Sequence, residues 1–242
     1  MKRVFLDLGN TRFKWADDRL NLLGARAYPA ERPAGAIAET LAPVSVEARL
    51  VIASVRNEGF NRALADELAK RGLKSEFLRT ATLPGFRPAY RRVEEFGVDR
   101  ALNLIGAARD YPAPLLVASA GTAVTFDLLD SAGAHLGGCI FPGLGLLRRS
   151  LTRAADGIAS VDVEGSLLAD GTAAGAAGGV MEGYLSAVAG IIGEMVDKTP
   201  GNVTILLTGG DAPLIHAHLP LPSRVDSLLL FKGMDIVSQR RA

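Results

Sequence analysis

FLDLGNTRFKW, residues 5–15, begins as a buried strand and is then interrupted by a glycine turn. After Gly9-Asn10-Thr11 the chain resumes with alternating polar and apolar residues, as a second strand would. Glycine and asparagine are typical of the tight turn in a β-hairpin. VASAGTAVTFDLLD, residues 117–130, repeats this arrangement of strand, glycine turn and strand. The pair of turns indicates an internal duplication, and two unrelated hairpins are the alternative.

Composition indicates a globular protein that folds without disulfides. The chain has 242 residues, of which 48% are hydrophobic and 6% aromatic. That length suits one large domain or two modest ones, with enough apolar surface for a core. The net charge is +1, and the paired arginines lie far apart in the sequence. This pattern does not resemble a nucleic-acid-binding surface, so we expect no nucleic-acid partner.

Cysteine, histidine and hydropathy patterns point to an ordinary cytoplasmic protein. The single cysteine, Cys139, excludes an internal disulfide, and its isoleucine neighbour favours a buried position. The histidines lack metal-ligand spacing, and His216 and His218 are expected at the surface. Residues 171–193 are weakly charged, but Glu182 interrupts them, which argues against a membrane span. Because no secretory signal pattern is seen either, we expect cytoplasmic localisation and no membrane binding.

Strand-like and helix-like segments alternate along the chain, which predicts the α/β class. A boundary near Pro112 divides it into an N-terminal domain, residues 1–112, and a C-terminal domain, residues 113–242. Two such halves facing each other would place both glycine turns on one ligand-binding cleft. Strands are expected at 3–8, 12–16, 50–54, 75–78, 115–119, 124–129, 135–140 and 203–210, and helices at 61–72, 97–110, 144–155, 172–198 and from 228 onward.

Both glycine turns carry residues that suit a nucleoside triphosphate. A glycine turn exposes backbone N–H groups and lets an anion approach closely. Thr11, Lys14, Thr122 and Thr125 add hydroxyl and ammonium donors, and Asp7 suits a hydrated Mg²⁺. The chain has no GxxxxGK[ST] phosphate loop, no GxGxxG fingerprint after a strand and no GxSxG turn. A nucleotide site would therefore be built from the paired turns.

An ordered set of motifs gives a more specific indication, since together they resemble type III pantothenate kinases. The resemblance covers nearly the whole chain, with the motifs in the family's order. They are DLGNT at 7–11, GVDR at 97–100, SAGTAVTFD at 119–127, GGCIFPGLGL at 137–146 and TGGDA at 208–212.

The resemblance implies a fold, an activity and an assembly. The fold would be α/β, with duplicated ribonuclease-H-like domains of the actin-like ATPase superfamily and mixed sheets around a central nucleotide cleft. The activity would be ATP-dependent phosphorylation of pantothenate to 4'-phosphopantothenate, the first step of coenzyme A biosynthesis. A homodimer is also implied, with the small-residue stretch 172–192 as the candidate contact and a core helix as the alternative.

It also implies individual roles. Asp99 would be the catalytic proton acceptor, and Asp7 would lie near Mg²⁺. Thr172 would contact substrate from the partner of a dimer. ATP phosphates would be bound by Asp7, Leu8, Gly9, Asn10, Thr11, Arg12, Phe13 and Lys14 in the first turn and by Gly121 and Thr122 in the second, and pantothenate by Tyr90, Gly97, Val98, Asp99, Arg100 and Thr172.

Some of these positions also have a purely structural interpretation. Asp99 would stabilise the N-terminus of a helix by about 0.3–1 kcal/mol. Tyr90 would be an ordinary surface aromatic, and Thr172 a helix cap. The pair Gly209-Gly210 either lets adenosine approach the backbone or simply ends a strand.

The sequence departs from the family at Ser119, where an aspartate usually helps to bind a monovalent cation. A neutral hydroxyl cannot supply the same charge. We therefore expect dependence on K⁺ or NH₄⁺ to be weakened or lost, unless another group supplies the ligands.

Two other functions stay open from the sequence. One is a kinase for another small hydroxylated acceptor, because a fold alone does not determine a substrate. The other is a nucleotide-binding regulatory protein without kinase activity, which the retained Asp7 and Asp99 argue against.

Overall fold

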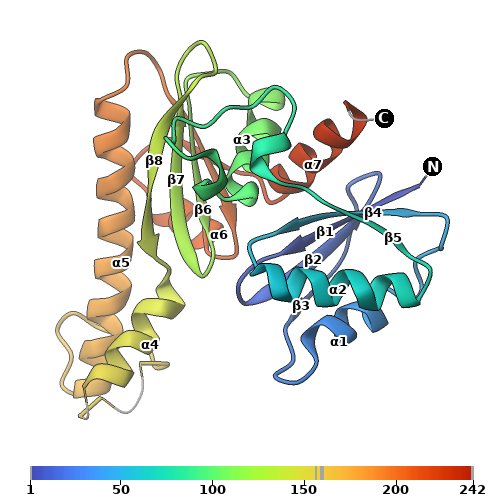
Figure 1. Ribbon diagram of the computed structural model, residues 1–242. Helices are drawn as coiled ribbons and strands as arrows, with labels where there is room; N and C mark the ends of the chain where they lie inside the picture. The colour runs from blue at the N-terminus through green and yellow to red at the C-terminus, as the bar shows by residue number, and fades with distance from the viewer. Residues whose placement is uncertain (1, 156, 159–160, 241–242) are drawn as a thin grey trace. The chain divides into compact units, whose positions relative to one another are not determined.

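The computed structural model describes residues 2–155, 157–158 and 161–240 (Figure 1). The chain forms two compact units, one running up to Asp110 and resuming at Leu228, the other covering Tyr111–Ser227. The domain boundary between residues 112 and 113 stays a prediction, which concerns where one duplicated half of the sequence ends and the other begins. The compact units differ from it because the last helix packs in the first unit.

The described residues of the first unit form a sheet, four helices and two 3₁₀ turns. They are β1 (Arg3–Leu8), β2 (Arg12–Asp17), β3 (Leu22–Ala27), α1 (Pro33–Thr40), β4 (Arg49–Ser54), α2 (Glu58–Lys70), β5 (Lys74–Phe77), η1 (Thr80–Thr82), η2 (Val93–Glu95), α3 (Val98–Asp110) and α7 (Leu229–Gln239).

Its five strands lie in the order β3-β2-β1-β4-β5. β1 pairs antiparallel with β2 through the glycine turn and parallel with β4, which places β1 at the centre. Alternate residues of β1 point to opposite faces. Leu6 packs with Ile37 and Leu64 under α1 and α2, which Figure 1 shows against the sheet. Phe5 is also fully buried, and α3 and α7 pack against β4 and β1, so both faces are covered.

In the second unit, the residues that the structure describes form a sheet and three helices. They are β6 (Leu115–Ala120), β7 (Ala123–Leu129), β8 (His135–Pro142), α4 (Leu144–Ala154), α5 (Thr172–Asp197), β9 (Thr204–Gly209), α6 (Ala212–His218) and β10 (Ser223–Val225).

The second sheet repeats the design of the first. Its order is β10-β9-β6-β7-β8. β6 pairs antiparallel with β7 through the second glycine turn and parallel with β9, as β1 does with β2 and β4. The shared order and strand directions confirm the α/β class and the duplicated mixed sheets expected from the two turns.

α5 is long and apolar enough to cross a membrane by length and composition alone. However, its Tyr184, Leu185, Val188 and Ile192 are buried in the core of the second unit. A core helix of a globular protein passes the same test, and the packing of α5 is of that kind.

The predicted burial of Cys139 is wrong. Cys139 is exposed, and Ile140 beside it is 61% exposed. Both lie on β8, which forms an edge of its sheet. Apolar neighbours therefore did not imply burial, because this strand has a neighbouring strand on one side only. His216 and His218 lie at the exposed end of α6, as expected.

Candidate active site

The first glycine turn is a tight hairpin between β1 and β2. Leu8 faces Phe13 in the last register pair, and the Gly9 N–H donates to the Arg12 carbonyl at 3.1 Å. Asn10 and Thr11 form the exposed tip. The buried strands thus present a short stretch of backbone to solvent, which is what an anion-binding turn needs.

Two residues that sequence reasoning missed hold this turn. The Tyr28 hydroxyl donates to the Gly9 carbonyl at 2.9 Å. Arg56 Nη1 donates to the Asn10 carbonyl at 2.9 Å. Neither residue belongs to a recognisable motif, and only the folded chain brings them to the turn.

Asp7 and Asp99 lie close enough to influence each other. Asp7 stands near the carboxyl end of β1, opposite Lys14 in the register of the hairpin. Burial raises the pKa of the Asp7 carboxyl from 3.8 to about 7, Lys14 lowers it in part, and the Asp99 carboxylate adds to the rise. Asp99 lies in the first helical turn of α3. This helix therefore brings the expected proton acceptor close to Asp7, the acid that precedes the first glycine turn.

The GVDR segment forms a second buried group around Arg100. Arg100 is 4% exposed, and its Nη1 donates to the Tyr90 hydroxyl at 2.9 Å. Its guanidinium lies over the Phe96 ring at 4.4 Å and the Tyr90 ring at 5.5 Å. A Cβ at Gly97 would collide with the Asp99 carboxylate. Tyr90 is therefore a stacked partner of Arg100 rather than an isolated surface aromatic.

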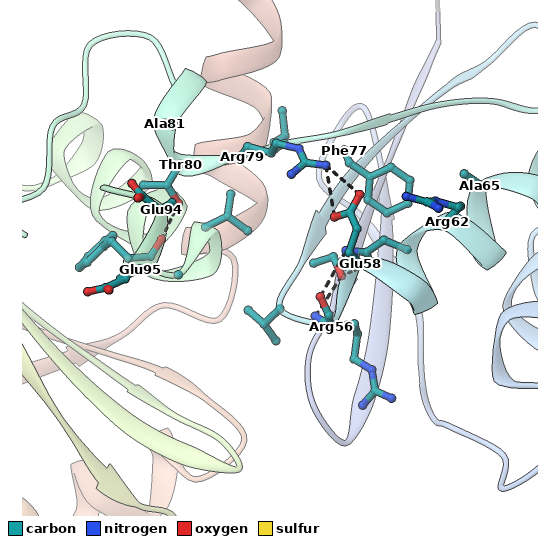
Figure 2. Close-up of a pocket in the computed structure, with 17 residues that line it drawn as sticks. Arg56, Glu58, Arg62, Ala65, Phe77, Arg79, Thr80, Ala81, Glu94 and Glu95 are labelled. Atoms are coloured by element: carbon teal, nitrogen blue, oxygen red, sulfur yellow. Dashed lines mark hydrogen bonds and ion pairs between the residues drawn. The ribbon is translucent and has the colours of Figure 1, made fainter. Parts of the chain in front are cut away.

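A cavity of about 690 Å³ adjoins this group, and Gly97 and Val98 belong to its lining (Figure 2). The cavity lies beyond the carboxyl ends of β4 and β5. Figure 2 shows two of its lining residues, Arg79 and Glu58, joined by an ion pair, whose N–O distance is 3.1 Å. Its charged lining residues are Arg56, Glu58, Arg62, Arg79, Glu94 and Glu95, a balanced set that suits a polar ligand.

The second glycine turn is held by its neighbours in the second unit. The Gly121 N–H donates to the Ala123 carbonyl at 3.0 Å, and the Thr122 carbonyl accepts from the Gly143 N–H at 3.1 Å. The Asp211 N–H donates to the Ala120 carbonyl at 3.3 Å, which ties the GG segment to the same strand end. Burial raises the pKa of the Asp211 carboxyl, and Arg148 lowers it in part.

Ser119 lies on β6 between two other hydroxyl residues. Its register partners are Thr125 on β7 and Thr208 on β9. Across the described residues, 2–155, 157–158 and 161–240, no group of three or more His, Cys, Asp or Glu is placed to hold a metal ion. The residues paired with Ser119 in the sheet therefore carry neutral hydroxyls, at a position where the family usually has an aspartate.

Thr172 is the first residue of α5, and it is exposed. The helix cap is Gly171, and no side chain bonds the cap. The capping role considered for Thr172 is therefore wrong. Thr172 belongs to the second unit with Gly121 and Thr122, whereas Asp7, Tyr90, Asp99 and Arg100 belong to the first.

Comparison with known proteins agrees with these motifs. The family model described as type III pantothenate kinase matches residues 3–194. The chain belongs to the type III pantothenate kinase family. A type III pantothenate kinase from Janthinobacterium sp. (strain Marseille) is 34% identical over 94% of both chains. One from Psychrobacter cryohalolentis is 34% identical over 96% of both chains.

Solved structures similar to this family member support its fold. A proposed Baf family transcriptional activator from Campylobacter jejuni has a TM-score of 0.63 at 20% identity over 98% of both chains. MreB5 of Spiroplasma citri bound to ADP has a TM-score of 0.56 at 13% identity, covering 99% of this chain and 97% of its own. A polyphosphate/ATP-glucomannokinase from Arthrobacter has a TM-score of 0.52 at 14% identity, covering 100% and 99%. The type III pantothenate kinase chain thus has the actin- and hexokinase-like ATPase fold across its whole length.

Proposed function

We propose that the protein transfers the γ-phosphoryl group of ATP to pantothenate, giving 4'-phosphopantothenate for coenzyme A biosynthesis. Membership of the type III pantothenate kinase family supports the reaction. The observation that carries it is the approach of Asp99 to Asp7, beside a cavity lined by Gly97 and Val98. A proton acceptor, a metal-binding acid and an acceptor pocket are the parts that phosphoryl transfer to an alcohol requires.

The two glycine turns are proposed to bind the phosphates. In the first turn, Asp7 to Lys14 supply backbone N–H groups, the Thr11 hydroxyl and the Lys14 ammonium. In the second turn Thr122 supplies its hydroxyl and backbone N–H, and Gly121, whose N–H donates to the Ala123 carbonyl, lets the phosphate approach closely. Preorganised donors of this kind stabilise the charge that develops on the transferred group.

The residues present fit a magnesium ion. Asp7 is a half-buried acid whose ionised form is destabilised by burial and by Asp99, and Lys14 compensates only in part. A divalent cation beside Asp7 would supply the missing positive charge and neutralise phosphate oxygens. Asp7 would hold it, with the remaining ligands coming from phosphate and water.

Asp99 is proposed to take the proton of the acceptor hydroxyl as the phosphoryl group arrives. A positioned general base contributes about 10²–10⁴-fold to the rate. Tyr90, Gly97, Val98, Arg100 and Thr172 are proposed to bind pantothenate. The guanidinium of Arg100 is held by Tyr90 and Phe96, so its direction is set before substrate binds.

Three further properties are proposed. Dependence on K⁺ or NH₄⁺ is weak, because Ser119 and its threonine neighbours offer only neutral oxygens. The protein is cytoplasmic and binds neither nucleic acid nor membranes. It forms a homodimer through α5, whose Gly179, Gly183 and Gly190 face open space. Exposed Leu136 and Ile140 on β8 provide additional apolar surface in the same unit.

A direct test is product analysis by mass spectrometry after incubation with ATP and Mg²⁺. The acceptor would be pantothenate, pantetheine or a simple sugar in separate reactions. We expect 4'-phosphopantothenate to form far faster than any other product. A faster reaction with another acceptor would instead support a different small-molecule kinase.

A further inference from the structure

Arg56, which belongs to no recognised motif, lies against two aromatic rings and the first glycine turn. It lies between the end of β4 and Asn57, the N-cap of α2. Its guanidinium lies 4.9 Å from the Tyr28 ring centre and 4.9 Å from that of Phe60. From there Nη1 donates to the Asn10 carbonyl at 2.9 Å. A planar cation between two rings loses little further freedom when it forms that bond.

Tyr28 completes the support of the turn. Its hydroxyl donates to the Gly9 carbonyl, and its backbone N–H donates to the Thr11 carbonyl at 3.4 Å. Three consecutive carbonyls of the turn are therefore held by Tyr28 and Arg56. In a trans peptide the C=O and the following N–H point in opposite directions. Holding these carbonyls thus directs the next three N–H groups away from Tyr28 and Arg56.

The charge of Arg56 is not used in an ion pair within the part of the chain that the structure describes. Its Nε is buried there without a hydrogen-bond partner. An unpaired buried donor on a cation costs the folded protein free energy. A positive charge behind an anion-binding turn, however, favours the bound anion.

We propose that Arg56 is a positioning residue for nucleotide binding. It acts through its hydrogen bond to the Asn10 carbonyl, and Tyr28 holds the neighbouring carbonyls of the turn. This inference rests on the proposed function only in assigning the nucleotide phosphates to the first glycine turn. Arg56 does not bind the phosphates itself. It fixes the peptide planes that present N–H groups to them, and it places a positive charge behind the turn.

The test is calorimetric measurement of Mg²⁺·ADP binding, which needs no turnover. Arg56→Ala removes both the bond to Asn10 and the charge, so its Kd should rise about tenfold or more. Arg56→Lys keeps a cation that reaches the carbonyl but loses the planar stacking, and an intermediate Kd is expected. Tyr28→Phe removes one hydroxyl without changing shape, with a rise of about threefold expected.

Arg71→Gln is the matched control. Arg71 lies at the other end of α2, where Nη1 binds the carbonyl and carboxylate of Glu67. The Arg71→Gln variant should bind Mg²⁺·ADP with the same Kd as the wild type. Thermal unfolding of each variant shows whether it is folded, and if Arg56→Ala is not, Arg56→Lys and Tyr28→Phe decide.

Unchanged Kd values in folded Arg56 and Tyr28 variants would overturn the proposal, as would a wild type that does not bind Mg²⁺·ADP. Failure of the proposed function appears differently. In that case the wild type binds the nucleotide but does not phosphorylate pantothenate, and the comparison of Kd values still decides the role of Arg56.

Discussion

Asp7 lies where the end of a buried strand meets the first turn of a helix that carries a second acid. Burial and the Asp99 carboxylate both disfavour its ionised form, and the pKa rises to about 7. A carboxylate in such a place is costly to the ligand-free protein and becomes useful when a cation binds. This is the conflict between stability and function that active sites often show.

The first prediction concerns stability against pH. The folded-state pKa of Asp7 is raised from 3.8 to about 7, so protonation favours the folded protein. This stabilisation is fully present below pH 4 and is lost as pH rises through about 7, by on the order of 4 kcal/mol. Asp7→Asn carries no charge, so its stability relative to wild type should increase from pH 4 to pH 8. Urea unfolding without ligands measures this, and a stability difference that does not change with pH would contradict it.

The second prediction concerns Ser119. The rate with K⁺ or NH₄⁺ should be close to that with a bulky organic cation, because hydroxyls alone provide no negative charge. Ser119→Asp should bind K⁺ more strongly and become more dependent on it. Steady-state kinetics with each chloride salt measures both, and strong potassium activation of the wild type would argue that other groups provide a cation site.

At the scale of elements, the central strand of each sheet ends beside its parallel neighbour, β1 beside β4 and β6 beside β9. In the second unit β6 and β9 end together, and Gly209, the last residue of β9, pairs with Ala120 and has a φ of +94°. A Cβ there would overlap the Ala120 carbonyl. The close approach explains the first glycine of the TGGDA segment by packing alone.

The third prediction follows from this close approach of Gly209 to Ala120. Gly209→Ala should lower the free energy of unfolding by roughly 1–3 kcal/mol, since alanine is strained at this positive φ and its methyl would overlap backbone. Gly210→Ala is the matched control, because no neighbouring atom of the part of the chain that the structure describes lies within 4 Å of its added Cβ. Chemical denaturation should give different unfolding free energies for the two variants. Equal stability would contradict the prediction and show that the backbone at Gly209 and Ala120 moves apart easily.

Sequence periodicity identified the elements that pair through the glycine turns, because alternation and turn residues are local signals. It missed β3, α1, α6 and β10, whose patterns are short or weak. It also missed Arg56 and Tyr28, which meet the first turn only through the fold of the first unit. Cys139 shows the same limit, since its position on an edge strand depends on sheet order rather than on its neighbours.

At the scale of the whole molecule, the chain contains two copies of one mixed-sheet design. β1 and β6 have the same neighbours in the same directions, so each glycine turn follows the central strand of its sheet. The duplication answers why the glycine turn recurs. The second copy differs in carrying α5, a 26-residue helix only partly covered by its own unit.

The fourth prediction concerns assembly. Gly183→Leu should convert the proposed homodimer to a monomer, because a large side chain prevents close approach of a partner helix. Among the described residues, nothing outside α5 itself lies within 4 Å of a Cβ added at Gly183, so the fold should be kept. Sedimentation of wild type and variant measures the state, with circular dichroism as the check on folding. A dimer that persists in the variant would exclude this face of α5 as the contact.

The most direct measurement is the rate of 4'-phosphopantothenate formation by wild type, Asp99→Asn and Asp110→Asn. Asp99 and Asp110 lie at opposite ends of α3, and Asp110 pairs with Arg109 and Lys232 away from the first turn. We expect wild type and Asp110→Asn to form product, whereas Asp99→Asn binds nucleotide but is slower by about 10²–10⁴-fold. No product from the wild type, or full activity in Asp99→Asn, would contradict this expectation.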